Sequence, residues 1–199
     1  MSTLIPVGAS KSQLPSTFTY AQAREAGVSK HTFYRWRSEG HIEPLSRGLY
    51  RRTDRDVADL ELIEIAQKAP RATICLTSAL VRHGLSDEIP QAIDIALPRG
   101  TRAPVTAAPV AWHHFEPATF DVGRNVLRLA GGSTIALYAA ERCIIDAFRT
   151  RAHGGHELAH DALKRWLRQR GSNPASLLRM GASFPRALAA LRSAMEILL

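Results

Sequence analysis

One stretch of the sequence, residues 29–38, carries side chains whose chemistry suits nucleic acid. Ammonium, guanidinium and hydroxyl groups donate to phosphate oxygens, and an arginine can also bind a guanine edge through two hydrogen bonds. We therefore predict a DNA-contact surface made of Ser29, Lys30, His31, Thr32, Tyr34, Arg35, Arg37 and Ser38.

A helix over residues 30–39 would position this set. Ser29 can act as its N-cap, because a serine hydroxyl accepts a hydrogen bond from the first helical turn. Phe33 and Trp36 are three residues apart, so both can pack inward and leave the polar side chains on the outer face. The alternative is that Tyr34 and Trp36 stack on single-stranded bases.

Two further elements complete a DNA-binding arrangement. A shorter helix is expected to begin after Thr17 or Thr19 and to end at Gly27, and a hairpin is expected over residues 42–51. Two helices joined by a short turn that contains glycine, followed by a hairpin, are typical of a winged helix-turn-helix. Arg47 would lie at the tip of the wing, where it can contact the DNA backbone or the minor groove.

The charge of the chain is positive and unevenly distributed. The 199 residues hold 26 Lys plus Arg and 18 Asp plus Glu, which gives a net charge of +8. Residues 1–55 and residues 151–199 each carry +5, whereas residues 56–150 carry −2. Arg51 and Arg52 are expected to extend the basic surface of the first segment. A positive balance favours an anionic partner, and the last segment would meet either more DNA or an acidic protein surface.

A second pattern suggests metal chemistry. His156, Glu157 and His160 form an H-E-x-x-H motif, in which two histidines on one helical face bind zinc and the glutamate acts as a base. A metal-dependent hydrolase is therefore an alternative function. Longer versions of the motif place glycine and histidine where this chain has Leu163 and Trp166, and no third ligand follows. We expect no metal site, no cofactor and no catalytic residue, and hence no enzyme.

The order of the expected elements indicates an α+β protein. We predict an irregular N-terminal arm over residues 1–17, a winged helix-turn-helix domain over residues 18–55, and a mixed C-terminal domain over residues 56–199 that ends in helices. In the last domain, helices are expected over residues 56–68, 139–151, 156–170 and from Pro185, and a short helix capped by Thr77 or Ser78 is expected to run through His83. The inward side chains are expected to include Ile144, Ile145 and Phe148 in the helix over 139–151, and Leu163 and Trp166 in the helix over 156–170. Strands are expected over residues 92–97, 110–115, 126–129 and 134–138.

The cysteines and the apolar runs indicate the cellular compartment of the protein. Cys75 and Cys143 are the two cysteines, each among apolar neighbours, which is too few for a disulfide framework. No run approaches the roughly 18 apolar residues that a membrane span requires, and the N-terminus lacks the pattern of a secretory signal. We expect a soluble cytoplasmic protein with no membrane partner.

Several segments of the chain together resemble one family. Residues 19–36, T-Y-A-Q-A-R-E-A-G-V-S-K-H-T-F-Y-R-W, and then R-G-L-Y-R, closely resemble the N-terminal winged-helix unit of the AbiEi-family antitoxins. Residues 76–90, L-T-S-A-L-V-R-H-G-L-S-D-E-I-P, are similar to a short helix and turn of that family. Residues 95–100 and 139–151 resemble its following strand and its mid-domain helix, in the same order.

The resemblance implies a function. Such a protein is the antitoxin of an AbiE-type, type IV toxin–antitoxin pair linked to phage defence. Its N-terminal domain binds repeats in double-stranded operator DNA, with two protomers on the DNA, and represses its own operon. Its C-terminal domain is implicated in neutralising a nucleotidyltransferase-like toxin, with or without direct contact. The resemblance supports residues 29–37 and Arg47 as DNA contacts. A toxin-binding module without specific DNA recognition remains a further alternative.

Overall fold

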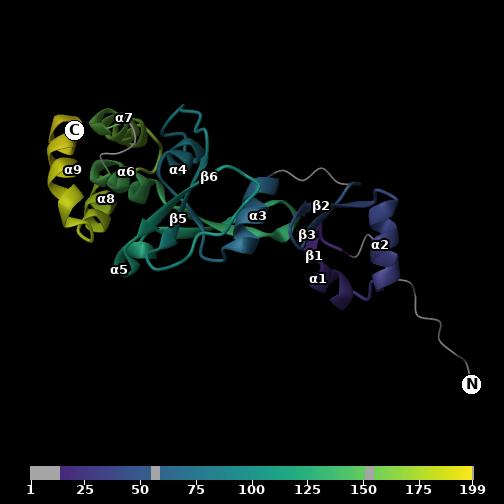
Figure 1. The fold of residues 1–199 in the computed structure, drawn as a ribbon. Helices are drawn as coiled ribbons and strands as arrows, with labels where there is room; N and C mark the ends of the chain where they lie inside the picture. Colours follow the sequence, from purple (N-terminus) through teal and green to yellow (C-terminus); the bar gives the residue numbers. More distant parts are fainter. Residues whose placement is uncertain (1–13, 55–58, 151–154, 199) are drawn as a thin grey trace, which may run out of the picture. The chain divides into compact units, whose positions relative to one another are not determined.

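The computed structural model describes residues 14–54, 59–150 and 155–198, and its contacts divide the chain into two compact units (Figure 1). The bounds of the two units are Met1–Lys68 with Arg128–Thr134, and Ala69–Leu127 with Ile135–Leu199. The first unit therefore continues past residue 55, where the sequence predicts a domain boundary. The predicted arm over residues 1–17 and the predicted domains over residues 18–55 and 56–199 stay predictions.

The first unit has a winged-helix arrangement. Its elements are β1 (Thr17–Thr19), α1 (Tyr20–Glu25), α2 (Lys30–Ser38), β2 (Ile42–Ser46), β3 (Leu49–Arg52) and α3 (Leu60–Lys68). The three strands form an antiparallel sheet in the order β1-β3-β2. A pair of short helices followed by a hairpin confirms the predicted fold class at this end of the chain.

Local signals set the beginning of α1. The Thr19 hydroxyl accepts from the backbone N–H of Gln22 at 3.2 Å, and the Gln22 side-chain oxygen accepts from the N–H of Thr19 at 2.8 Å. This reciprocal pair satisfies two N–H groups that a helix start would leave without partners. Thr17, the other predicted cap, instead lies in β1 opposite Arg51.

Aromatic side chains form the interior of the first unit. Phe18 and Phe33 are 0% and 1% exposed, and their rings meet edge to face. The Phe33 ring also meets the rings of Tyr20 and Tyr50, each at 4.8 Å between centroids. Because such edge-to-face contacts add to the burial of apolar area, this cluster holds α1, α2 and the sheet together.

The second unit combines a mixed sheet with helices. Its elements are β4 (Thr73–Ile74), α4 (Leu76–Arg82), β5 (Ile93–Pro98), β6 (Val110–Phe115), α5 (Pro117–Phe120), β7 (Arg124–Arg128), β8 (Thr134–Tyr138), α6 (Ala140–Arg149), α7 (Gly155–Leu167), α8 (Pro174–Gly181) and α9 (Pro185–Leu198). The strand order is β6-β5-β4-β8-β7. β4 is parallel to β8, β5 is parallel to β6, and β4 and β5 are antiparallel.

Helix α6 is central to the helices of this unit. It contacts α4, α7, α8 and α9, and Figure 1 shows α7, α8 and α9 gathered beside it. Its predicted inward residues Ile144, Ile145 and Phe148 are buried. The predicted apolar face of α7 is buried at Leu163 and Trp166. No helix within the described residues is long and apolar enough to cross a membrane.

The start of α4 differs from the expectation. Thr77 or Ser78 was expected to cap this helix, but it begins at Leu76, and Cys75 occupies the N-cap position without a side-chain bond. The Ser78 hydroxyl instead donates to Asp94. The sheet explains the shift, because β4 ends at Ile74 and the chain turns directly into the helix.

Candidate nucleic-acid interface

The turn between α1 and α2 is fixed by backbone bonds and one side chain. Gly27 adopts a φ of +83°, and its N–H donates to the Arg24 carbonyl at 3.0 Å. This left-handed residue ends α1, and glycine adopts it without steric cost. The Arg24 guanidinium donates to the Val28 carbonyl at 2.7 Å. Sequence reasoning overlooked this contact, although a basic residue near a helix C-terminus is a known signal for it.

Ser29 is the N-cap of helix α2, as predicted. The Ser29 hydroxyl accepts from the Thr32 N–H at 3.0 Å and lies 2.8 Å from the Thr32 hydroxyl, to which it donates. Both predicted contact hydroxyls are therefore engaged with each other at the first turn. The N–H groups of this turn are the part of α2 that favours a phosphate oxygen.

The inner face of α2 carries its two large aromatic rings. Phe33 is 1% exposed and Trp36 is 6% exposed, and both belong to the core of the first unit together with Val28. This confirms the prediction that the two side chains pack inward. Trp36 is covered and therefore cannot stack on a base, whereas Tyr34 is 50% exposed.

The outer face of α2 gathers five of the predicted contact residues. A shallow hollow of about 810 Å³ lies over Lys30, His31, Tyr34, Arg35 and Ser38. These side chains come from successive turns of one helix, so they form a continuous strip. Such a strip can present donors to base edges in a major groove while its ends meet phosphates.

Among the residues that the structure describes, most charges on α2 and the wing have no strong ion-pair partner. Within the described residues, no ion pair forms with Lys30, Arg37 or Arg47. Arg35 lies 4.0 Å from Glu39, and both side chains are about half exposed. An exposed pair at this distance contributes little, so the Arg35 guanidinium remains able to bind an anion.

The wing carries one exposed arginine at its tip. Arg47 is exposed in the turn between β2 and β3, where Gly48 adopts a φ of +80°. Arg51 forms an ion pair with Glu43. The expectation for Arg52 is wrong: its side chain is 5% exposed, lies 2.6 Å from an Asp54 oxygen, and does not extend the basic surface, because its charge is already neutralised within the unit.

The H-E-x-x-H residues lie at the start of α7. Glu157 and His160 are exposed, and the His160 ring meets the ring of Phe148 at 5.3 Å. The side chain of His156 lies outside the described residues. Among those described, no three His, Cys, Asp or Glu side chains form a group that could hold a metal. The absence of a metal site stays an expectation.

The carboxylate of Asp94 in the second unit is buried and is held by hydrogen bonds within the fold. Asp94 accepts from the Ser78 N–H at 3.2 Å and lies 2.9 Å from His113 Nε2. Burial alone would raise the pKa of Asp94, but the bonds from His113 and Ser78 hold it below its usual value. Asp87 is instead exposed and pairs with Arg165 on the surface.

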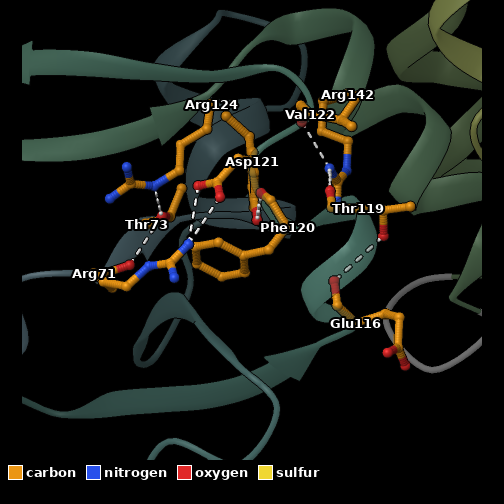
Figure 2. Close-up of polar contacts among 10 residues, drawn as sticks. Arg71, Thr73, Glu116, Thr119, Phe120, Asp121, Val122, Arg124 and Arg142 are labelled. Carbon is orange, nitrogen blue, oxygen red and sulfur yellow. Dashed lines mark hydrogen bonds and ion pairs between the residues drawn. The ribbon is translucent and has the colours of Figure 1, made fainter.

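Arg142, an arginine of α6 in the second unit, is held by bonds within the protein. Figure 2 shows the Arg142 guanidinium donating to the carbonyls of Thr119 and Val122, both at 2.7 Å. The same side chain is 0% exposed and pairs with Asp146, which is also 0% exposed. Burial raises the pKa of Asp146, and the neighbouring guanidinium groups oppose this rise. Arg142 therefore fastens α6 to the segment around α5.

Neither cysteine has the environment of a nucleophile. Cys75 and Cys143 are fully buried, and burial raises the pKa of both thiols. Because the thiolate is the reactive form, both act as small core residues.

The comparison with protein families gives one match. The model of a family described as "Transcriptional regulator, AbiEi antitoxin" matches residues 11–53. This segment holds α1, α2 and the wing, and it covers less than half of the chain. The match confirms the predicted resemblance for this segment. No curated protein matches the chain.

A comparison with solved structures concerns nearly the whole chain. The fold is similar to that in the crystal structure of the RV2827C protein from Mycobacterium tuberculosis, with a TM-score of 0.55 and 16% sequence identity. The similarity covers 90% of this chain and 72% of that chain. At this identity the likeness shows a shared fold alone.

Proposed function

We propose that this protein is a DNA-binding transcriptional autorepressor and the antitoxin of an AbiE-type toxin–antitoxin operon in the cytoplasm. The observation that carries the proposal is the outer face of α2. It presents Lys30, Arg35 and Arg37, which have no strong partner in the described part of the chain. The helix that carries them is anchored by Phe33 and Trp36. The family match over residues 11–53 supports the regulatory role.

The division of labour follows from the chemistry of each group. Contacts from Lys30, Arg37 and Arg47 to phosphates would supply most of the affinity and make it steeply dependent on salt. Arg35, in the middle of the exposed strip, and His31, in the first turn of α2, would read base edges in the major groove. Ser29, Thr32, Tyr34 and Ser38 would complete the contact set. In this proposal the chain acts by binding, and it carries out no reaction.

Operator repeats favour two protomers on the DNA, because each winged helix covers one repeat.

The toxin partner would be a nucleotidyltransferase-like protein encoded beside this chain. The second unit would neutralise the toxin by binding it directly, by modifying it or by opposing its effect. Co-expression of the toxin with the full chain tests this half of the proposal. Continued toxicity at normal antitoxin levels would contradict it.

The DNA-binding half is tested by binding the full chain to two labelled duplexes. One holds the region upstream of its own gene, and the other holds the same bases in scrambled order. We expect affinity for the upstream duplex to exceed that for the scrambled one by about 10³-fold or more, as in other specific DNA-binding proteins. Equal affinity for the two duplexes would favour a toxin-binding module without specific DNA recognition.

A further inference from the structure

The second unit contains a cavity that the proposed DNA interface does not use. Its volume is about 550 Å³. Its walls come from the residues after β5, the end of β6, the start of α5, the end of α6 and the start of α9. The lining side chains include Arg99, Phe115, Thr119, Arg149, Phe184 and Arg186.

The cavity lies at the carboxyl ends of a parallel strand pair. Pro98 of β5 and Phe115 of β6 are opposite each other at the last position of the ladder. The Arg99 N–H donates to the Phe115 carbonyl at 2.7 Å and closes this edge. In sheets that contain parallel strands with helices beside them, ligands bind outside the carboxyl ends of the strands. The position alone therefore suits a ligand.

The charge of the lining is positive. Arg99, Arg149 and Arg186 come from three different segments, and Glu116 is the one carboxylate among the described residues that line the cavity. Glu116 accepts from Arg99 at 2.7 Å. Within the described part of the chain, Arg186 forms no ion pair. Guanidinium groups that converge from several segments are suited to a phosphate, which they can bind through two hydrogen bonds each.

A further excess of positive charge lies beside the cavity. Arg142 and Arg149 share the single carboxylate of Asp146, at 2.9 Å each. Arg142 Nη2 and Arg149 Nε are buried and have no hydrogen-bond partner within the described residues. One carboxylate cannot neutralise two guanidinium groups, and a buried charge without compensation is costly. An anion in the cavity would supply the missing negative charge.

Aromatic rings hold Arg149, one of the three arginines that line the cavity, in place. The Arg149 guanidinium lies over the rings of Phe115 and Phe184, at 4.9 and 5.6 Å from their centroids. The side chain is 24% exposed, so it is held in place and still accessible. A cation positioned before the ligand arrives loses less conformational entropy on binding than a free surface arginine does.

We propose that this cavity binds a phosphate ester of nucleotide size, with the phosphate held by Arg149 and Arg186 and with Arg99 at the rim. Cavities of about 300–1,000 Å³ hold ligands of this size, whereas inorganic phosphate would leave most of the space unfilled. The site uses none of the residues assigned to DNA, so it stands or falls independently of the proposed function.

Calorimetric titration of the full chain with AMP, ATP, adenosine and inorganic phosphate tests the proposal. We expect saturable binding of AMP or ATP, weaker binding of inorganic phosphate, and no binding of adenosine. Equal affinity for AMP and inorganic phosphate would overturn the proposed ligand size. Stronger binding of a 5′-phosphorylated oligonucleotide than of either nucleotide would overturn a small-molecule ligand, as would no binding by any of the probes.

Two exposed arginines on α9 provide a matched pair of variants. Arg186→Ala removes a cation that lines the cavity, and Arg192→Ala removes one from the same helix outside it. We expect Arg186→Ala to weaken nucleotide binding by about tenfold or more, because it removes charge-assisted hydrogen bonds. Arg192→Ala should change the affinity by less than about twofold. Equal effects of the two variants would overturn the site, and the thermal unfolding of both should match that of the unmodified chain.

Discussion

Two regions of the molecule, α2 with the wing and helix α6, use arginine in opposite ways. On α2 and the wing, Arg35, Arg37 and Arg47 are exposed and have weak protein partners or none within the described residues. On α6, Arg142 is 0% exposed and donates to one carboxylate and two carbonyls, and Arg149 shares that carboxylate. The first group is available to an outside anion, whereas Arg142 is committed to holding the fold.

This difference shows why net charge is a weak guide to function. Exposed cations contribute little to stability, so their loss should change binding and leave folding intact. Removing one partner of a buried pair should instead lower the stability of the fold, because the other charge is left buried and uncompensated. Variants of both regions test this contrast.

Arg142→Ala should lower the free energy of unfolding by about 3–5 kcal/mol, because it leaves Asp146 buried without its main partner. Urea denaturation of the full chain measures this change. The matched control is Arg192→Ala, which removes an exposed arginine and should stay within about 0.5 kcal/mol of the unmodified chain. A similar stability for both variants would show that the buried pair is not structural.

Arg35→Ala should weaken binding to the upstream duplex by about 1–3 kcal/mol and relax the base preference at one position. Arg47→Ala should weaken binding to all duplexes by a similar factor, because the wing meets the backbone. Competition binding against single-base variants of the duplex separates the two behaviours. Loss of stability in either variant, rather than of DNA affinity, would break the contrast with Arg142.

Ser29→Ala should lower the free energy of unfolding by about 1 kcal/mol, because the Thr32 N–H loses its acceptor at the start of α2. Thermal unfolding checks the loss, and Ser193→Ala, which changes an exposed serine of α9, serves as the control. An unchanged melting temperature together with a large loss of DNA affinity would mean that the hydroxyl serves the phosphate rather than the helix.

Asp94→Asn should cost up to about 1 kcal/mol near neutral pH and progressively less in acid. The pKa of Asp94 is lowered in the folded protein, so its carboxylate stabilises the fold above the usual value of 3.8. This contribution is lost as the pH falls through the folded-state pKa. Unfolding curves at a series of pH values should therefore show the two proteins converging below pH 3.8. A constant difference down to acid pH would exclude the carboxylate as the cause.

The elements that sequence reasoning predicted are those with local signals. Helix α2 has a capping serine and aromatic residues at helical spacing, and the hairpin has glycine beside Arg47. The strands β1 and β4 were not predicted, because they span three and two residues and exist through pairing with distant strands. Strands this short show no periodicity of their own.

The roles of individual arginines could be predicted less well. Arg51 and Arg52 are adjacent in the sequence, and only the folded structure shows that Arg52 is buried and paired with Asp54. The pair of Arg142 and Asp146 has the spacing of an ordinary surface pair, and its burial depends on helices packed around α6. The cavity depends on residues from β5 to α9, which only the fold brings together.

The salt dependence of DNA binding tests the central claim most directly. The logarithm of the affinity for the upstream duplex should fall linearly with the logarithm of the salt concentration. We predict that the Arg35→Ala, Arg47→Ala double variant binds more weakly and has a slope shallower by about 1, since Arg47 is the phosphate contact of the two and each lost phosphate contact changes the slope by about 1. A double variant with the affinity and slope of the unmodified chain would contradict the assignment of α2 and the wing to DNA.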